Sequence, residues 1–288
     1  MGRIRRGWEL TKKSWGLLRA NPQLFRFPLY GAAATIPLAL ITFGPGLLLI
    51  DDDKIAAAIP LLLIGVYLLN VVGFYFSVGL AAAAEKIFRG QADVTVADGL
   101  AVSRSRFAQI CGWAALSTAI SAFMAALENQ GGIGGQIAAR LVGMAWALVT
   151  FLAVPVIALE GTGPLETLKR SASIFRERWG QQITGNIAIG GAVGLLGILP
   201  STLLIVAGVM VWASSGFVGA LLVIVGAIGL AIALLISKAL SGVFGVALYR
   251  YATDGEAVGG FTAEELESAV KIKGGSRRTP PTATPGTI

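Results

Sequence analysis

The chain of 288 residues has a single cysteine, Cys111, and no histidine. One thiol cannot make a disulfide framework within a chain. Without histidine, Cys/His metal sites and general acid–base chemistry by an imidazole are excluded. Cys111 starts an apolar run, where a small buried side chain is a better interpretation than a nucleophile. The sequence therefore predicts no cofactor, no metal site and no catalytic residue.

Charge is also scarce, because charged residues make up 14% of the chain whereas soluble domains carry about 25%. Hydrophobic residues account for 55% of the chain and gather in six long apolar runs. Each run can cross a bilayer core of roughly 30 Å as a helix, since a backbone in lipid has to bond to itself. The predicted spans cover about residues 27–50, 55–84, 108–127, 141–159, 183–213 and 217–249.

Proline, glycine and one lysine interrupt some of these runs. Pro37 and the Gly-Pro-Gly sequence at residues 44–46 predict a kink or an early end of the first span, and Pro200 predicts a bend in the fifth. Lys238 interrupts the sixth run. We expect its ammonium group to reach the membrane interface while the helix continues past it.

The lysine and arginine residues fall almost entirely into every second gap between the runs, and Lys54 and Arg140 are the two exceptions among 23. Cytoplasmic loops are enriched in these residues, so the alternation predicts six spans with the N- and C-termini in the cytoplasm. The net charge of +7 then reflects topology and contact with anionic lipid head groups. We expect no nucleic acid partner.

Three amphipathic segments precede the three pairs of spans, at about residues 8–22, 95–107 and 164–179. We call them the elbow helices. In the first and third, one half of the helical wheel is apolar and the other half carries the cations, as expected for helices that lie at a membrane interface. The apolar halves contain Trp8, Thr11, Trp15 and Leu18 in the first, and Leu165, Leu168, Ala172, Phe175 and Trp179 in the third.

The elbow helices also match one another. Residues 12–14 (Lys-Lys-Ser) align with residues 169–171 (Lys-Arg-Ser) at an offset of 157, and Arg104 aligns with Arg176 at an offset of 72. This internal repeat predicts an all-α membrane bundle of six transmembrane helices, in three like-oriented units of elbow helix plus helical hairpin. The alternative is that basic segments beside a span resemble one another without a repeat.

Several element boundaries are visible in the sequence. Thr95 and Asp98 have the spacing of a capping box, and Pro164 suits the first turn of a helix. We divide the chain into a six-span membrane domain, residues 1–254, and a mostly disordered cytoplasmic tail, residues 255–288. A short helix is predicted within the tail, around residues 262–271.

The cations of the elbow helices are the candidate contacts to lipid head groups. Plain topology signals without specific recognition are the alternative interpretation of the same residues. The candidates are Lys12, Lys13, Arg19, Arg104, Lys169, Arg170 and Arg176.

Asn70 lies in the middle of the second span and is the candidate intramembrane polar site. Such an amide either lines a pathway or makes a helix–helix hydrogen bond, and Asn186 presents the same choice. The acidic residues 51–53 favour a polar turn over a Ca²⁺ or Mg²⁺ site, because consecutive carboxylates in a tight turn cannot all converge. Gly190 and Gly194 indicate close helix packing.

No ionisable residue falls in the middle of a predicted span. Proton relays, ion-coupled transporters and intramembrane hydrolases normally need at least one. No acid, base and nucleophile converge in the sequence either, which disfavours an enzyme.

Two segments resemble a family of bacterial six-span integral membrane proteins of unknown function. They are residues 7–19 together with Phe27-Pro28-Leu29, and residues 168–172 with 179–180 and 185–186. The resemblance covers about residues 1–250. The layout is more distantly similar to the membrane domain found beside some glycerophosphodiesterases, whose catalytic domain is absent from this chain. Neither resemblance supplies a catalytic residue.

These observations lead to one functional hypothesis and one alternative. The first is a non-enzymatic protein of the bacterial inner (plasma) membrane that serves as a lipid-interacting scaffold or membrane subunit. Its expected partners are the lipid bilayer, anionic lipids and another protein in the membrane. The alternative is a small permease or channel for uncharged or lipid-like solutes, with Asn70 near the path.

Overall fold

The computed structural model describes residues 2–48, 55–130, 132–179, 194–212 and 214–270, and within these ranges it contains helices and no strand. In chain order the elements are α1 (Gly2–Ala20), α2 (Gln23–Leu48), α3 (Ile55–Phe88), α4 (Val96–Ser105), α5 (Phe107–Gln130), α6 (Gly132–Thr150), α7 (Ala153–Leu159), α8 (Pro164–Trp179), the π-helical turn η1 (Gly194–Ile198), α10 (Leu199–Val211), α11 (Gly216–Asp254) and α12 (Ala263–Val270).

Four of the helices, α2, α3, α5 and α11, are long and apolar enough to cross a membrane by their length and composition. They indicate a membrane protein. A further apolar segment, Leu196–Val211, is shorter and covers the end of η1 and all of α10. The all-α class predicted from the sequence is thus confirmed for the described residues.

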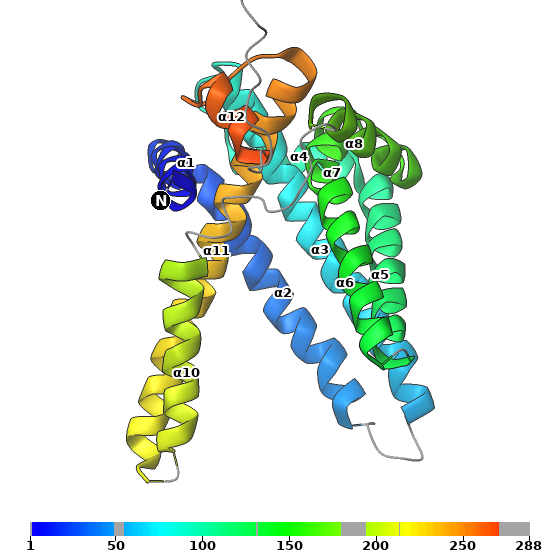
Figure 1. The fold of residues 1–288 in the computed structure, drawn as a ribbon, viewed down its shortest axis with the longest axis vertical. Helices are drawn as coiled ribbons and strands as arrows, with labels where there is room; N and C mark the ends of the chain where they lie inside the picture. The colour runs from blue at the N-terminus through cyan, green and yellow to red at the C-terminus, as the bar shows by residue number, and fades with distance from the viewer. Residues whose placement is uncertain (1, 49–54, 131, 180–193, 213, 271–288) are drawn as a thin grey trace, which may run out of the picture.

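The long helices form pairs that share one end of the molecule (Figure 1). Helix α2 pairs with α3, α5 with α6, and α10 with α11. The short helices α4, α7, α8 and α12 gather with α1 at the top of Figure 1, which we call the packed end. At the opposite end, the far end, the α10–α11 pair diverges from α2.

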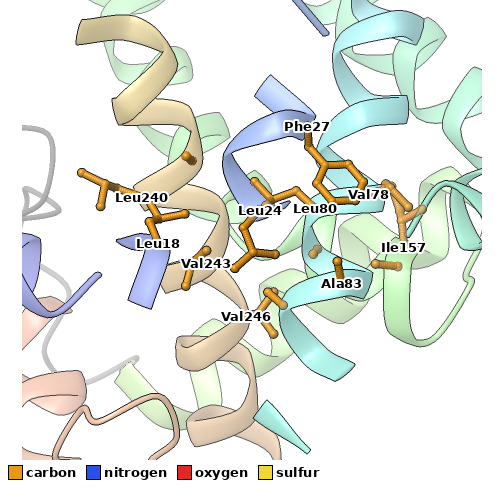
Figure 2. Packing of buried hydrophobic residues seen from close by; sticks show 14 of the residues in the cluster. Leu18, Leu24, Phe27, Val78, Leu80, Ala83, Ile157, Leu240, Val243 and Val246 are labelled. Carbon is orange, nitrogen blue, oxygen red and sulfur yellow. The ribbon is translucent and has the colours of Figure 1, made fainter. Parts of the chain in front are cut away.

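The buried side chains lie mainly at the packed end. One cluster joins α1, α2, α3, α5, α7 and α11, and Figure 2 shows Leu24 and Phe27 of α2 packed against Val78 and Leu80 of α3. A second cluster joins α1, α7, α8, α11 and α12. Large apolar side chains nearer the far end are exposed, such as Leu40, which is 70% exposed. A surface of this kind is stable only in an apolar surrounding such as lipid.

Helix α11 is the central element of the packed end. Its 39 residues form one continuous helix, and the seven consecutive residues from Val243 to Tyr249 are all buried. A helix that is buried on every side has to be surrounded by other elements. Helices α1, α2, α3, α7, α8 and α12 all contact α11.

The backbones of helices α3 and α4 approach each other closely where the two helices cross. A Cβ atom on Gly99 of α4 would lie 2.4 Å from the carbonyl oxygen of Gly79 and 2.5 Å from the ring of Phe27. One turn later, the Ser103 hydroxyl donates a hydrogen bond to the Tyr75 carbonyl at 2.7 Å. The predicted capping box is confirmed at the start of this helix. The Thr95 hydroxyl accepts a hydrogen bond from the Asp98 backbone N–H, and the Asp98 carboxylate accepts one from the Thr95 backbone N–H.

Helices α10 and α11 also approach each other through small residues. A Cβ atom on Gly208 or on Gly219 would lie 2.8 Å from the carbonyl oxygen of the other. A Cβ atom on Gly226 of α11 would likewise lie 2.9 Å from the carbonyl oxygen of Ser201 in α10. Close approach of this kind is typical of helix pairs in membranes. The glycines singled out in the sequence lie elsewhere, and Gly190 is outside the described residues.

Prolines account for two irregular places in the helices. The helical run at 132–159 is divided at residues 151–152, four residues before Pro155, because a proline ring clashes with the carbonyl of the residue four positions earlier. The π-helical turn η1 ends at Ile198, two residues before Pro200, near which the sequence predicts a bend. Helix α2, by contrast, continues through Pro37 to Leu48, so the expected early end does not occur.

Three further boundaries differ from the expected ones. The gap left between the predicted third and fourth spans, residues 128–140, is helical on both sides of residue 131, and Gly135 of α6 packs against the Leu127 carbonyl. Helix α1 extends from the first elbow segment back to Gly2. The first part of the predicted tail packs against the bundle through Phe261 and Leu266, and the predicted short helix is confirmed as α12. Residues 271–288 lie outside the described part.

We predict opposite effects for two Gly→Ala substitutions. At Gly99 the added methyl group meets backbone and the Phe27 ring, so Gly99→Ala should lower the free energy of unfolding by about 1–3 kcal/mol. At Gly16 of α1 no heavy atom lies within 4 Å of a new Cβ atom, so Gly16→Ala should be neutral or stabilising by about 0.5–1 kcal/mol. Thermal unfolding of both variants in detergent measures this, and equal stability of the two would contradict the α3–α4 contact.

Candidate functional site

The seven elbow cations differ in exposure, because two are half-buried and five are exposed. Helices α1, α4 and α8 cover the ranges predicted for the elbow helices and place all seven candidates at the packed end. Lys13 and Arg170 form ion pairs with carboxylates. The other five side chains are exposed. They are Lys12, Arg19, Arg104, Lys169 and Arg176.

Lys13 links the first helix to the last described one. Its ammonium donates to Glu265 Oε2 at 2.6 Å. The same carboxylate accepts from the backbone of Thr262 at 2.8 Å, and the Thr262 hydroxyl accepts from the Glu265 backbone, so α12 begins with a capping box. Partial burial of Glu265 opposes ionisation, but the hydrogen bonds from Lys13 and Thr262 outweigh it and lower the pKa of the carboxyl.

Glu160 joins three elements directly after the end of α7. Its carboxylate accepts from Arg170 Nε of α8 at 2.9 and 3.1 Å. It also accepts from the Tyr249 hydroxyl of α11 at 2.6 Å. The hydrogen bond to Glu160 raises the pKa of Arg170 further above its ordinary value. Arg170, predicted as a lipid contact, is therefore occupied in holding α8 to α7.

Glu85, near the end of α3, is the most buried carboxylate of the described residues, at 4% exposure. Its Oε1 accepts from Arg250 of α11 at 2.8 Å and from Arg89 at 2.6 Å. Arg250 also pairs with Asp254, at 3.2 Å, and with Glu256. Glu85 Oε2 is buried and has no hydrogen-bond partner in the described part. Such a carboxylate depends strongly on the cations beside it.

Tyr249 and Arg250 are consecutive on α11, and their partners belong to different helices. Tyr249 reaches Glu160, after α7, and Arg250 reaches Glu85 in α3. We call these two contacts the α11 clamp. Together they fasten the last pair of long helices to both of the others.

No local pattern in the sequence predicts the α11 clamp, because the residues of its two contacts are 89 and 165 positions apart. The helical wheels also do not separate the buried side chains from the exposed ones. Trp15 and Leu165, assigned to the apolar halves, are 45% and 65% exposed, whereas Ser14, Thr167 and Ser171 are fully buried. The Ser171 hydroxyl donates to the carbonyl of Val149 in α6. Small polar residues, which a hydropathy pattern assigns to water, thus share the packed faces of α1 and α8 with apolar residues such as Leu18 and Phe175.

Asn70 serves a helix–helix contact. Its side-chain nitrogen donates to Thr118 Oγ1 of α5 at 3.0 Å, and Thr118 donates in turn to the Ala114 carbonyl. Of the two interpretations left open for Asn70, the structure shows the hydrogen bond. Residues 51–53 and Asn186 lie outside the described residues.

In the part of the chain that the structure describes, no group of three or more His, Cys, Asp or Glu side chains is placed to hold a metal ion. Cys111 is half-buried in α5.

The sequence model of one protein family matches residues 55–260. The chain belongs to the family of unknown function DUF6159. The match begins at the first residue of α3 and ends after α11, so it contains all four residues of the α11 clamp. Helices α1, α2 and α12, with the Lys13–Glu265 pair, lie outside it. No curated protein matches the chain.

Membership in DUF6159 agrees in part with the resemblance found in the sequence. A family of unknown function is shown, over residues 55–260. The motif at residues 7–19 lies outside the matched range, and the distant likeness to the glycerophosphodiesterase-associated domain stays a prediction.

The two arginines on Glu85 should differ in their effect on stability. Arg250 is 14% exposed and Arg89 is 61% exposed. Arg250→Gln leaves a buried carboxylate without its buried cation and should lower the free energy of unfolding by about 3–5 kcal/mol. Arg89→Gln should lower it by less than about 1 kcal/mol. Thermal unfolding of the two variants measures the difference, and losses of the same size would show that the clamp does not depend on Arg250.

The contact between α1 and α12 should depend on pH. The folded-state pKa of Glu265 lies below its ordinary value, so the pair stabilises the fold above that value and is lost as the pH falls through the lowered pKa. Spin labels on the exposed positions Gly16 and Glu264 measure the distance between the helices from pH 7 downward. In Lys13→Gln the separation should begin at a higher pH than in the wild type. Identical profiles would contradict the role of Lys13.

Proposed function

We propose that this protein is a non-enzymatic integral protein of the bacterial inner membrane that crosses the bilayer six times, has both termini in the cytoplasm, and acts as a lipid-interacting scaffold or membrane subunit. The observation that carries the proposal is the exposed elbow cations, which lie at the same end of the molecule as its buried core. Anionic lipid head groups are their expected partners.

Helix lengths support this placement in the membrane. Helix α11 has 39 residues, which at about 1.5 Å per residue is about 58 Å, nearly twice the roughly 30 Å of a hydrocarbon core. Its far-end half carries exposed apolar side chains such as Phe217 and Ile228, and its other half contains the buried segment from Val243 to Tyr249. The packed end is therefore proposed as a cytoplasmic layer next to the bilayer.

The pairing of helices supports six spans. The predicted second, third and sixth spans coincide with α3, α5 and α11, and the first with α2. For the fourth, α6 and α7 together cover the predicted residues 141–159. The predicted fifth span corresponds to η1 and α10, with its first residues outside the described part.

Burial at matched positions supports the threefold repeat. The offsets of 157 and 72 residues align Ser14 of α1, Gly99 of α4 and Ser171 of α8. All three are small and buried. Gly99 contacts the preceding long helix through the Gly79 carbonyl, and Ser171 does so through the Val149 carbonyl. A small residue at this position allows each elbow helix to lie close to the bundle.

The permease or channel alternative receives less support. Its candidate polar residue, Asn70, is engaged in the hydrogen bond between α3 and α5. A continuous polar path would need side chains of this kind to face an open cavity. The scaffold is thus the better-supported function.

The head-group role is tested by removing the five exposed elbow cations together. The variant combines Lys12→Gln, Arg19→Gln, Arg104→Gln, Lys169→Gln and Arg176→Gln. Wild type in nanodiscs should unfold at a higher temperature in phosphatidylglycerol than in phosphatidylcholine, by about 2–4 °C per kcal/mol of lipid contact. The five-cation variant should lose most of this difference.

The matched control is Arg140→Gln, an exposed cation in the far-end half of α6 that belongs to none of the elbow helices. It should keep the full lipid dependence. Equal lipid dependence of wild type and five-cation variant would contradict the proposal. Flux of uncharged solutes through liposomes that contain the wild type would favour the permease instead.

A further inference from the structure

Lys238 lies in a groove where helices α2, α3 and α11 separate. The groove is shallow, with about 20 Å³ of space for water-sized molecules, and Lys238 beside it is an exposed residue. Its walls are Pro28 and Gly31 of α2, and Gly73, Phe76 and Leu80 of α3. The glycines hold it open, because no side chain projects from them into the space.

The groove sits at the point where α11 leaves α3. Gly242 is one turn from Lys238 on the same face of α11, and a Cβ atom there would lie 2.5 Å from Leu80. At Lys238, α11 and α3 are further apart, and the lysine side chain lies between them with its Nζ 3.8 Å from the Cβ position of Gly73. One turn further along, Leu234 is exposed. We call this place the fork.

Three helices place the fork at the same depth, if the membrane position under the proposed function holds. Lys238 is 22 residues from the start of α11, Gly73 is 18 from the start of α3, and Gly31 is 17 from the end of α2. At about 1.5 Å per residue these separations are about 33, 27 and 26 Å from the far end. All three are close to the roughly 30 Å of a hydrocarbon core. The fork therefore lies at the cytoplasmic boundary of the lipid.

Lys238 is unlike the other cations close to the core. Lys13, Arg170 and Arg250 have carboxylate partners, whereas Lys238 has none among the described residues. An ammonium group at the edge of hydrocarbon needs an anion or water beside it. The Ser77 hydroxyl, the other polar side-chain group of the groove, bonds to the Gly73 carbonyl in its own helix.

We propose that the fork binds one anionic phospholipid of the cytoplasmic leaflet. The phosphate pairs with the Lys238 ammonium, and the first part of an acyl chain lies against Pro28, Gly31 and Phe76. This inference rests on the proposed placement in the membrane but uses none of the elbow cations. The charge of the lysine and the apolar walls match the two parts of a lipid at this depth.

Native mass spectrometry of the full-length protein in detergent tests this by titration with phosphatidylglycerol, phosphatidylcholine or inorganic phosphate. Wild type should bind one phosphatidylglycerol more tightly than phosphatidylcholine. Lys238→Gln should weaken phosphatidylglycerol binding about fivefold, and Lys238→Arg should preserve it. Gly73→Leu fills the groove and should weaken both lipids.

Unchanged phosphatidylglycerol binding in Lys238→Gln would overturn the proposal, and so would equal weakening of phosphatidylcholine binding. Displacement of the lipid by inorganic phosphate at similar concentration would also overturn it, because the acyl chain would then contribute nothing. Thermal unfolding in phosphatidylcholine shows that each variant is folded, and Lys238→Arg serves as the matched control.

The five-cation variant separates this inference from the proposed function. If the fork acts alone, that variant keeps its single phosphatidylglycerol. Loss of lipid dependence in the five-cation variant together with unchanged binding in Lys238→Gln would refute the fork and leave the scaffold proposal standing. Unchanged lipid dependence in the five-cation variant together with weakened phosphatidylglycerol binding in Lys238→Gln would refute the head-group role of the elbow helices and leave the fork proposal standing.

Discussion

The arrangement of the long helices depends on the contacts that hold α11 at the packed end. Tyr249 and Arg250 bind carboxylates from two other parts of the bundle, Glu160 and Glu85, and the apolar segment before them is buried on all sides. Contacts between the long helices toward the far end involve small residues, and the apolar side chains there face outward. Lipid-facing surface gains nothing from burial, since lipid is as apolar as the side chains, so specific packing is concentrated at the packed end.

The sequence was sufficient for the parts of the fold that depend on hydropathy and local signals. It predicted an all-helical protein, the positions of four long apolar helices and the capping box at Thr95. Each of these follows from one segment alone, because a long apolar run has to be helical in lipid and a capping residue acts on its own helix.

The parts that were missed depend on partners distant in sequence. Nothing local to Glu85 shows that Arg250, 165 residues away, will reach it. The buried faces of α1 and α8 carry Ser14, Thr167 and Ser171, which a hydropathy wheel treats as polar although their small size is what suits close packing. The last span was correctly expected to continue as a helix past Lys238, but the groove beside this residue involves glycines of two other helices.

The central claim is that two carboxylates at the packed end hold the three pairs of long helices together through α11. Pulsed electron spin resonance measures this most directly, with labels at the exposed positions Lys169 of α8 and Glu264 of α12 in a Cys111→Ser background. The account predicts one narrow distance distribution in that background and a broad one after Glu85→Gln and Glu160→Gln are combined. A distribution that stays narrow in the double variant would contradict it.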